Sequence, residues 1–385
     1  MNTVLLTEEE QLLKNAVKDF ADQQLAPRAA ELDQSQEFPW DNFKGLADMG
    51  LLGLTIDQEY GGSGGTTRQL ALVVQEIARA CAATSVTYIA HLSLCTQFID
   101  MFGTEGQKRQ FIPPLAQGEH VGAFCLTEPG SGSDAAAMRT TSTRKDGSYI
   151  LNGSKTFITN APEAHTLVVL ATQDRSLGSK GIDALIVEGD STGLTVNPLH
   201  GKMGMRASSI AEVVFEDCPV PVENRMGEEG DGFRETLNVL TSSRISIAAQ
   251  CVGIAQAAYE AAVDYAKQRE AFGQHLADFQ GIQWMIADMA TNIEAARLLV
   301  WNAATLRDED KPFVTEASMA KLFASRIAVD SADKAVQIHG GAGYFAPMPV
   351  ERYFRDAKVT EIYEGTSEIQ RVIIARNILR SEGIG

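Results

Sequence analysis

The sequence predicts a mainly α-helical protein with a central β domain. Apolar residues follow helical spacing in the first third of the chain, short β-type runs follow, and long helical segments fill the remainder. At 385 residues the chain is long enough for two to three domains. We therefore expect an N-terminal helical domain (1–120), a central antiparallel β-barrel domain (121–230) and a C-terminal four-helix bundle (231–385).

The helical character of the first domain follows from caps and periodicity. Thr7 and Glu10 form the pattern of a capping box, in which each side chain bonds the other's backbone N–H. Residues Arg68–Ala80 repeat apolar side chains at helical spacing and predict a second helix. The glycine-rich run 61–65 between them predicts a loop.

The central segment is predicted to be β-structure. Its short β-type runs are Val121–Leu126, Ser148–Leu151, Thr156–Thr159, Thr166–Ala171, Ile182–Val187 and Ile210–Phe215. Asn152-Gly153 between two of these runs predicts a hairpin with a type I′ turn, because both residue types tolerate positive φ. Since no helical pattern separates the runs, an antiparallel sheet or barrel fits better than β-α-β units.

The final segment predicts long helices. Phe233–Lys267 contains no proline and is rich in Ala, Ile and Val, and Ile282–Leu306 and Val314–Ile338 have similar composition. Helices of this length favour an antiparallel bundle.

Composition restricts the classes of partner and compartment. The net charge of −17 and the pI of about 4.8 argue against nonspecific binding to nucleic acid or to an anionic membrane. The five cysteines are scattered, which favours free buried thiols and no metal site. No apolar run reaches about 18 residues, and the first residues lack a signal-type leader. We therefore expect a soluble, cytoplasmic protein.

The run 130–135, Gly-Ser-Gly-Ser-Asp-Ala, matches a dinucleotide-binding pattern but lacks its context. The residues that follow are poor helix formers, and Lys155 stands near the position where an acid should bind the ribose. We reject a Rossmann site here. The loop remains either a plain turn or a loop that holds phosphate through its N–H groups and Ser133.

A carboxylate directly before a predicted helix marks the end of the chain as a candidate site. Glu364 lies between Tyr363 and Gly365, and Thr366 is a good N-cap for the helix. The carboxylate would lie beside free N–H groups at the positive end of the helix dipole. That position suits the removal of a proton from carbon with stabilisation of an anion. Alone, the pattern favours a surface helix-capping acid, because acids before helices are common.

Six segments together resemble the acyl-CoA dehydrogenase family of flavoenzymes, and the likeness covers almost the whole chain. They are Phe124–Asp134 (FCLTEPGSGSD), Lys155–Asn160 (KTFITN), Lys202–Arg206 (KMGMR), Gln268–Gly273 (QREAFG), Gln337–Tyr344 (QIHGGAGY) and Tyr363–Thr366 (YEGT). No single segment is decisive, but all six occur in the order of the family. The resemblance implies a helical domain, a β domain and a helical bundle, as read above from periodicity.

The resemblance implies FAD as cofactor, bound between the β domain and the bundle. The implied flavin contacts in the β domain are Phe124, Leu126, Thr127, Gly132, Ser133, Phe157 and Thr159, with Gly132 and Ser133 also near the acyl-CoA. Phe157 stands where many relatives carry Trp, so ring stacking is retained. Thr366 and Glu368 would approach the adenine half.

A second set of implied contacts grips the FAD of a neighbouring subunit. It comprises Arg269, Phe272, Gln280, Gln337, Gly340 and Gly341. Arg269 suits a pyrophosphate because its guanidinium donates two parallel hydrogen bonds. Because such a site is formed by two subunits, the protein would need to oligomerise in order to bind its cofactor. The resemblance implies a homotetramer.

The resemblance implies that Glu364 is the catalytic base. Oxidation of a saturated acyl thioester to a trans-2-enoyl-CoA removes an α-proton and a β-hydride, and the hydride passes to the flavin. In relatives the thioester carbonyl is held by the backbone N–H of the base residue and a flavin ribityl hydroxyl. Burial should raise the pKa of Glu364 toward neutrality.

The remaining implied substrate contacts are Ser133, Thr241, Arg244, Tyr363 and Gly365, where Arg244 lines the CoA channel. Many relatives carry Asp at the position of Thr241. Some relatives place the base on the long helix, at the position of Ser243, which cannot serve as a base.

Alternatives remain open at this point. An acyl-CoA oxidase, a non-CoA flavoenzyme of the same fold and a catalytically silent flavin-binding module all share parts of the pattern. Electron-transferring flavoprotein is the electron acceptor that the resemblance implies. The acyl group is not determined by the sequence, since pocket depth depends on the packing of side chains such as Tyr88, His91 and Leu94.

Overall fold

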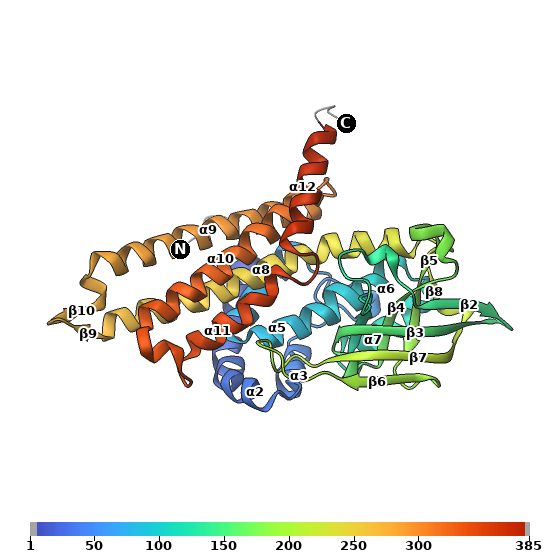
Figure 1. Ribbon diagram of the computed structural model, residues 1–385, viewed down its shortest axis with the longest axis horizontal. Coiled ribbons are helices and arrows are strands. Elements are labelled where there is room, and N and C mark those ends of the chain that lie inside the picture. The colour runs from blue at the N-terminus through green and yellow to red at the C-terminus, as the bar shows by residue number, and fades with distance from the viewer. Residues whose placement is uncertain (1–5, 382–385) are drawn as a thin grey trace.

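The computed structural model describes residues 6–381 and confirms the predicted order of helices, central sheet and helices (Figure 1). Residues 1–5, on which the expected absence of a leader partly rests, lie outside this described part. The first helices are α1 (Glu8–Phe20), α2 (Ala29–Ser35), α3 (Trp40–Asp48), α4 (Thr67–Ala80), α5 (Ala82–Ile89), α6 (Gln97–Phe102) and α7 (Glu105–Ala116). A π-helical segment, Ala90–Thr96, joins α5 to α6.

The predicted helix starts in this region are confirmed. Thr7 Oγ1 accepts from the Glu10 N–H at 3.2 Å, and the Glu10 carboxylate accepts from the Thr7 N–H at 2.8 Å. Helix α4 covers the predicted Arg68–Ala80 segment, and its own capping box is formed by Thr66 and Gln69. Both helices therefore begin where a side chain satisfies the free N–H groups of the first turn.

The central sheet is open and mixed, so the expected antiparallel barrel is wrong. Its strands are β1 (Gly122–Cys125), β2 (Thr141–Lys145), β3 (Ser148–Thr159), β4 (Thr166–Thr172), β5 (Ile182–Glu188), β6 (Leu194–Pro198), β7 (Ile210–Pro221) and β8 (Arg225–Met226). The strand order is β6-β7-β3-β2-β4-β5-β8, and β1 pairs with β4. The β1–β4 and β2–β4 pairings are parallel because the connections between these strands cross over instead of forming hairpins.

The predicted hairpin at Asn152-Gly153 is also wrong, because both residues lie inside the continuous strand β3. The Asn152 side chain donates to Asp217 and accepts from the Asp217 N–H on β7, which holds it in the sheet. Gly153 occupies a register irregularity where a Cβ would lie 2.7 Å from Thr140 Cα. The real turn between β2 and β3 is Asp146-Gly147, with φ of 48° and 81°.

Three long helices dominate the C-terminal part. Its helices are α8 (Gly232–Gln268), α9 (Gln280–Asp308), α10 (Val314–His339), α11 (Pro349–Lys358) and α12 (Ser367–Ser381), and a small ribbon is formed by β9 (Glu270–Ala271) and β10 (Gln274–His275). Helix α8 runs from the sheet to the β9–β10 ribbon at the opposite end of the molecule, and α12 projects from the body (Figure 1). At 37 residues, α8 spans about 55 Å.

Two properties of the described residues bear on compartment. All five cysteines are buried and free, as the sequence predicts. Among residues 6–381, no helix is both long enough and apolar enough to cross a membrane.

Candidate functional site

Glu364 lies in a short connection before α12 whose backbone is unusual. Glu364 has a φ of 49° and Gly365 a φ of 94°. Gly365 is required there, because a Cβ would also lie 2.6 Å from Gln370 Nε2. Thr366 Oγ1 accepts from the Ile369 N–H at 3.3 Å, which confirms the predicted N-cap. The local sequence thus ends the short 3₁₀ turn Val359–Glu361, adopts positive φ at Glu364 and Gly365, and starts α12.

The Glu364 carboxylate faces the middle of α8. Ser243 Oγ donates to Glu364 Oε2 at 2.5 Å, although the two residues are 121 positions apart in sequence. Burial raises the pKa of Glu364 to about 7, against the opposing effects of the Ser243 hydrogen bond and of the Lys321 and Arg244 charges. A carboxylate with this pKa can accept a proton near neutral pH.

Two buried cations surround this carboxylate. Lys321, from α10, donates from Nζ to the Gly365 carbonyl at 2.7 Å and has no exposed surface. Arg244, from α8, is only 5% exposed, and its Nε atom has no hydrogen-bond partner within residues 6–381. An unsatisfied guanidinium N–H beside the candidate base is available to a polar or anionic ligand.

The opposite side of the connection is filled by a hydrogen-bonded chain of side chains. Tyr363 Oη donates to Gln250 Oε1, and Gln250 Nε2 donates to Ser85 Oγ at 2.8 Å. Gln250 is completely buried. These hydrogen-bonded side chains therefore fill the space between Glu364 and α5.

The β-domain candidates lie on and beside β3. Phe157 interrupts the pairing of β3 with β7, has a φ of 57°, and leaves 66% of its side chain exposed. The Thr127 carbonyl accepts from the Thr156 N–H at 2.8 Å. Thr159 and Leu126 are half-buried, whereas Phe124 is buried and packs near Phe98. An exposed aromatic ring in strained backbone is a platform suited to a flat ligand.

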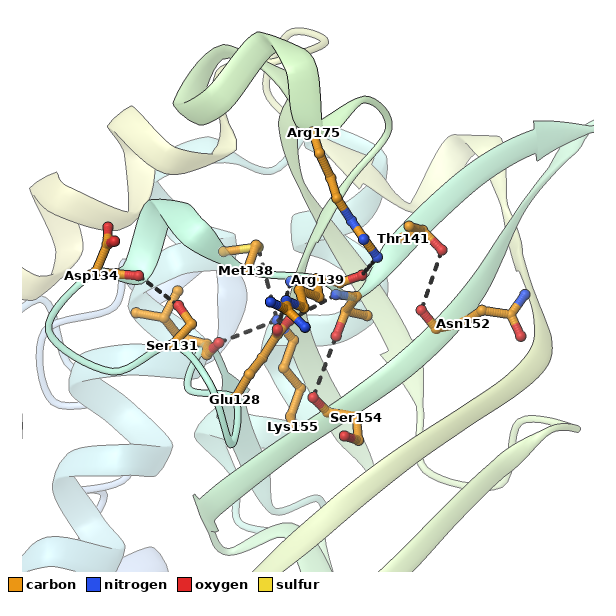
Figure 2. Close-up of polar contacts among 12 residues, drawn as sticks. Glu128, Ser131, Asp134, Met138, Arg139, Thr141, Asn152, Ser154, Lys155 and Arg175 are labelled. Carbon is orange, nitrogen blue, oxygen red and sulfur yellow. Dashed lines mark hydrogen bonds and ion pairs between the residues drawn. The ribbon is translucent and has the colours of Figure 1, made fainter.

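A buried ion pair joins β3 to the segment that precedes the glycine-rich loop (Figure 2). Lys155 Nζ contacts Glu128 Oε1 at 2.8 Å and the Leu126 carbonyl at 3.2 Å. The Glu128 carboxylate also accepts from the N–H groups of Arg139 and Thr140, at 2.6 and 2.9 Å. Glu128, at the start of the loop that carries Gly132 and Ser133, is thereby bonded to the backbone at the end of that loop.

That loop is exposed and is followed by no helix longer than one turn. Gly132 and Ser133 are exposed, and a Cβ at Gly132 would meet no atom within 4 Å. Ser131 Oγ donates to the Asp134 carbonyl at 2.7 Å (Figure 2). After the short turn Ala135–Ala137 the chain enters β2, so the rejection of a Rossmann site is confirmed.

The second set of cofactor candidates lies at the far end of α8, at the opposite end of the molecule from the β domain (Figure 1). Tyr265 near the end of α8 stacks on His339 at the end of α10, with ring centroids 4.2 Å apart. This contact brings together the segments that carry Arg269, Phe272 and Gln280 and those that carry Gln337, Gly340 and Gly341. Phe272 has a φ of 53° and is 97% exposed. Because α8 separates these residues from the β domain, the two sets do not form one site within a chain (Figure 1).

The remaining predicted contacts occupy varied positions. Thr241 is buried and donates to the Leu237 carbonyl of its own helix at 2.7 Å. Glu368 is exposed on the first turn of α12. Of the residues expected to set pocket depth, Tyr88 donates to the Leu51 carbonyl at 2.9 Å, and His91 bonds the Leu115 carbonyl and the Gly122 N–H. Both are completely buried, and burial lowers the pKa of His91 to about 4, so His91 is neutral and structural.

Sequence reasoning missed Lys321 and Gln250. Lys321 shares the face of α10 that carries Ala317, Ala324 and Ala328, at helical spacing. A single cation on a face of small apolar residues is the signal that could have identified it, because buried lysines need a partner. Gln250 gives a similar signal among the apolar residues of α8.

Residues 6–381 contain no group of three or more His, Cys, Asp or Glu side chains that could hold a metal ion.

Comparisons with known proteins find relatives along nearly the whole chain. The chain matches family models described as the acyl-CoA dehydrogenase N-terminal domain (7–119), middle domain (123–218) and C-terminal domain (230–379). It is 46% identical over 375 residues to a short-chain specific acyl-CoA dehydrogenase of Clostridium acetobutylicum, covering 97% of this chain and 99% of the relative.

Two solved structures are closely similar. Butyryl-CoA dehydrogenase of Megasphaera elsdenii has a TM-score of 0.96 and 43% identity, covering 99% of this chain and 100% of the other. A chain from a structural study of the electron-transferring flavoprotein of Acidaminococcus fermentans has a TM-score of 0.96 and 46% identity, with the same coverage. With matches along nearly its whole length, the chain belongs to the acyl-CoA dehydrogenase family.

Proposed function

We propose that this protein catalyses the FAD-dependent α,β-dehydrogenation of a short-chain acyl-CoA to the trans-2-enoyl-CoA, with Glu364 as the base. The observation that carries the proposal is the environment of Glu364. Its carboxylate is bonded by Ser243, lies among buried cations and has a pKa of about 7. A structural capping acid has no need of such surroundings, whereas a base that works near neutral pH does.

In this mechanism Glu364 takes the α-proton of the thioester. The proton passes to a carboxylate oxygen of Glu364. The electron pair of the α C–H bond, which places transient negative charge on the carbonyl oxygen, becomes the second bond between the α and β carbons as the β C–H bond breaks and its electron pair leaves as hydride. A positioned base contributes about 10²–10⁴ to the rate. Ser243 holds the carboxylate in its ionised form by donating to it.

The thioester carbonyl needs a hydrogen-bond donor as its oxygen gains negative charge. The Glu364 N–H donates no hydrogen bond within residues 6–381. It is therefore available to a carbonyl that lies beside the same residue's carboxylate. Loss of one such donor typically costs about 10²–10³ in rate.

The residues of the β domain fit a flavin. The exposed Phe157 ring offers a stacking surface, and the exposed Gly132–Ser133 loop would hold phosphate through its backbone N–H groups. Leu126 and Thr127 would also contact the flavin. Bound FAD supplies the two-electron acceptor for the β-hydride. We propose electron-transferring flavoprotein as the next acceptor, as the family resemblance implies.

We further propose a homotetramer in which each FAD is shared by two subunits. The set at the far end of α8, from Arg269 to Gly341, is exposed and too far from the β domain of its own chain to join that site. Exposed Phe272 and Tyr344 would be covered by a neighbouring copy. Helix α12 also projects from the body with Val372 and Leu379 partly exposed.

The packing around Gln250 supports a short acyl group. The buried Gln250 and the half-buried Tyr363 fill the space between Glu364 and α5 with hydrogen-bonded side chains. We expect Gln250→Ala to shift the preferred substrate toward longer acyl chains, measured as kcat/KM across straight-chain acyl-CoAs. A proportional loss for all chain lengths would contradict this role.

The test of the proposal is anaerobic bleaching of the visible flavin absorbance by a panel of acyl-CoAs, with the wild type and Glu364→Gln. We expect short-chain substrates to bleach the wild type and Glu364→Gln to lose this reaction while retaining its flavin. Bound flavin that no acyl-CoA bleaches would favour the silent or non-CoA alternatives. Bleaching that persists in Glu364→Gln would show that the base lies elsewhere, and rapid reoxidation by oxygen would favour an oxidase.

A further inference from the structure

Lys321 is the least expected charged group near the candidate site. It extends from α10 into the interior, is completely buried, and is one of the largest buried side chains of the described chain. Within residues 6–381 its ammonium group has a single hydrogen-bond partner, the Gly365 carbonyl at 2.7 Å. Burial of a charge with only one neutral partner is unfavourable, and such groups are usually retained for a reason other than stability.

The carbonyl that Lys321 contacts belongs to the most constrained part of the site. Gly365 O also accepts from Gln370 Nε2 at 3.0 Å, and the same amide lies 3.4 Å from Glu364 O. The two peptide groups that follow Glu364 are thus held from inside the bundle. Because Glu364 and Gly365 both have positive φ, this connection would relax to another conformation without such restraints.

The charged and titratable groups around Lys321 come from two elements. Arg244 and Cys251 lie on α8, and Glu361 and Glu364 lie in the connection before α12. Burial lowers the pKa of Lys321, and the neighbouring Cys251 and Glu364 oppose this effect. In return, Lys321 and Arg244 both favour the ionised form of Glu364. Within residues 6–381 Arg244 Nε has no hydrogen-bond partner, whereas Lys321 both carries a charge and restrains the Gly365 carbonyl through a hydrogen bond.

We infer that Lys321 is a positioning residue of the proposed reaction: it holds the Gly365 carbonyl so that the Glu364 carboxylate and N–H act on one substrate, and its charge keeps that carboxylate ionised. The inference rests on the proposed function. Lys321 thus has two separable effects: its hydrogen bond restrains the Gly365 carbonyl, and its positive charge favours the ionised form of Glu364.

The experiment compares Lys321→Met, which removes both effects, with Lys321→Gln, which retains a donor without charge. Lys334→Met on the same helix is the control, since Lys334 pairs with Asp330 near the surface. The readout is the pH dependence of flavin bleaching under anaerobic conditions. Lys321→Met should lower the plateau rate by about 10- to 100-fold and move the midpoint to higher pH. Lys321→Gln should recover part of the plateau rate but keep the raised midpoint.

A second readout does not depend on turnover. The free energy of unfolding is measured for the wild type, Lys321→Met, Glu364→Gln and the double variant, on both sides of pH 7. Coupling between the charges makes the changes non-additive well above pH 7, where Glu364 is ionised, and additive well below it. Additivity at both pH values with an unchanged midpoint would overturn the inference.

The failures of the two proposals are distinguishable. If Glu364→Gln still permits bleaching, the proposed function fails whatever Lys321 does. If bleaching depends on Glu364 but both Lys321 variants match the Lys334→Met control, only the inference about Lys321 fails. Should Lys321→Met not fold, the midpoint of Lys321→Gln decides, because that variant retains the hydrogen bond and lacks the charge.

Discussion

Two completely buried lysines, Lys155 in β3 and Lys321 in α10, have opposite relations to a nearby carboxylate. Lys155 bonds Glu128 directly, and Glu128 accepts further hydrogen bonds from two backbone N–H groups. Lys321 instead donates to the Gly365 carbonyl and affects Glu364 only through the electrostatic attraction of its positive charge. A saturated ion pair secures a loop, whereas a cation held apart from a carboxylate leaves that carboxylate free to react.

The pKa values of the two acids follow from this difference. Burial disfavours ionisation of both, but the Lys155 charge and hydrogen bonds outweigh burial at Glu128 and lower its pKa. At Glu364 burial prevails and raises the pKa to about 7. Ionised Glu128 therefore contributes stability above the ordinary carboxyl pKa, which is lost as pH falls. The raised pKa of Glu364 costs stability, fully so above about pH 7, and this cost shrinks progressively as pH falls from about 7 to the ordinary carboxyl pKa.

Breaking the saturated pair should have the largest effect on stability. Lys155→Met leaves the buried Glu128 carboxylate without its cation, so we expect the free energy of unfolding to fall by about 3–5 kcal/mol. Denaturant titration measures this change. Lys334→Met, which removes a surface pair, should cost at most about 1 kcal/mol. Equal losses in the two variants would contradict the structural role of the Lys155–Glu128 pair.

Removal of the direct donor to Glu364 should have an intermediate effect on rate. Ser243→Ala deletes a hydrogen bond to a charged group, worth about 1.5–3 kcal/mol. We expect bleaching at neutral pH to slow by about tenfold or more, with the midpoint of the pH profile moved upward. Ser242→Ala on the same helix is the matched control. A Ser243→Ala profile that superimposes on the wild type would show that the bond does not favour ionised Glu364.

Replacement of each acid by its amide should change stability in opposite directions. Glu364→Gln removes a carboxylate that is costly to ionise in the folded protein and should stabilise it by about 1 kcal/mol well above pH 7, a gain that fades as pH falls from about 7 to the ordinary carboxyl pKa. Glu128→Gln should destabilise it, because the amide cannot match the charged pair. Thermal unfolding across this pH range measures both changes. The same sign for both variants would remove the distinction between the two regions.

The smallest expected effect is the position of the pH midpoint in Glu128→Gln. Glu128 is not among the groups that set the pKa of Glu364, so the midpoint of bleaching should stay at about pH 7 even if the flavin is held less tightly. Measurement of flavin content alongside the pH profile separates the two properties. A shifted midpoint would mean that the two regions are electrostatically coupled.

The helix boundaries could largely be predicted from sequence, because caps and periodicity act over a few residues. Thr7 with Glu10, and Thr366 before α12, form the predicted bonds. The hairpin prediction at Asn152-Gly153 is wrong for a complementary reason. Local turn propensity favoured a reversal, but pairing of Asn152 with Asp217, 65 residues away, keeps the strand continuous. The barrel prediction failed similarly, since strand order depends on crossover connections that short runs do not reveal.

By itself, the sequence determined the family, the order of helices and sheet, and the position of a carboxylate before a helix start, because these depend on short motifs and local periodicity. Only the tertiary structure decided what surrounds that carboxylate. Ser243, Lys321 and Gln370 reach the Glu364–Gly365 connection from three different helices. Their effect on the pKa and backbone of Glu364 arises from burial and from contacts between residues far apart in the chain, which local sequence does not encode.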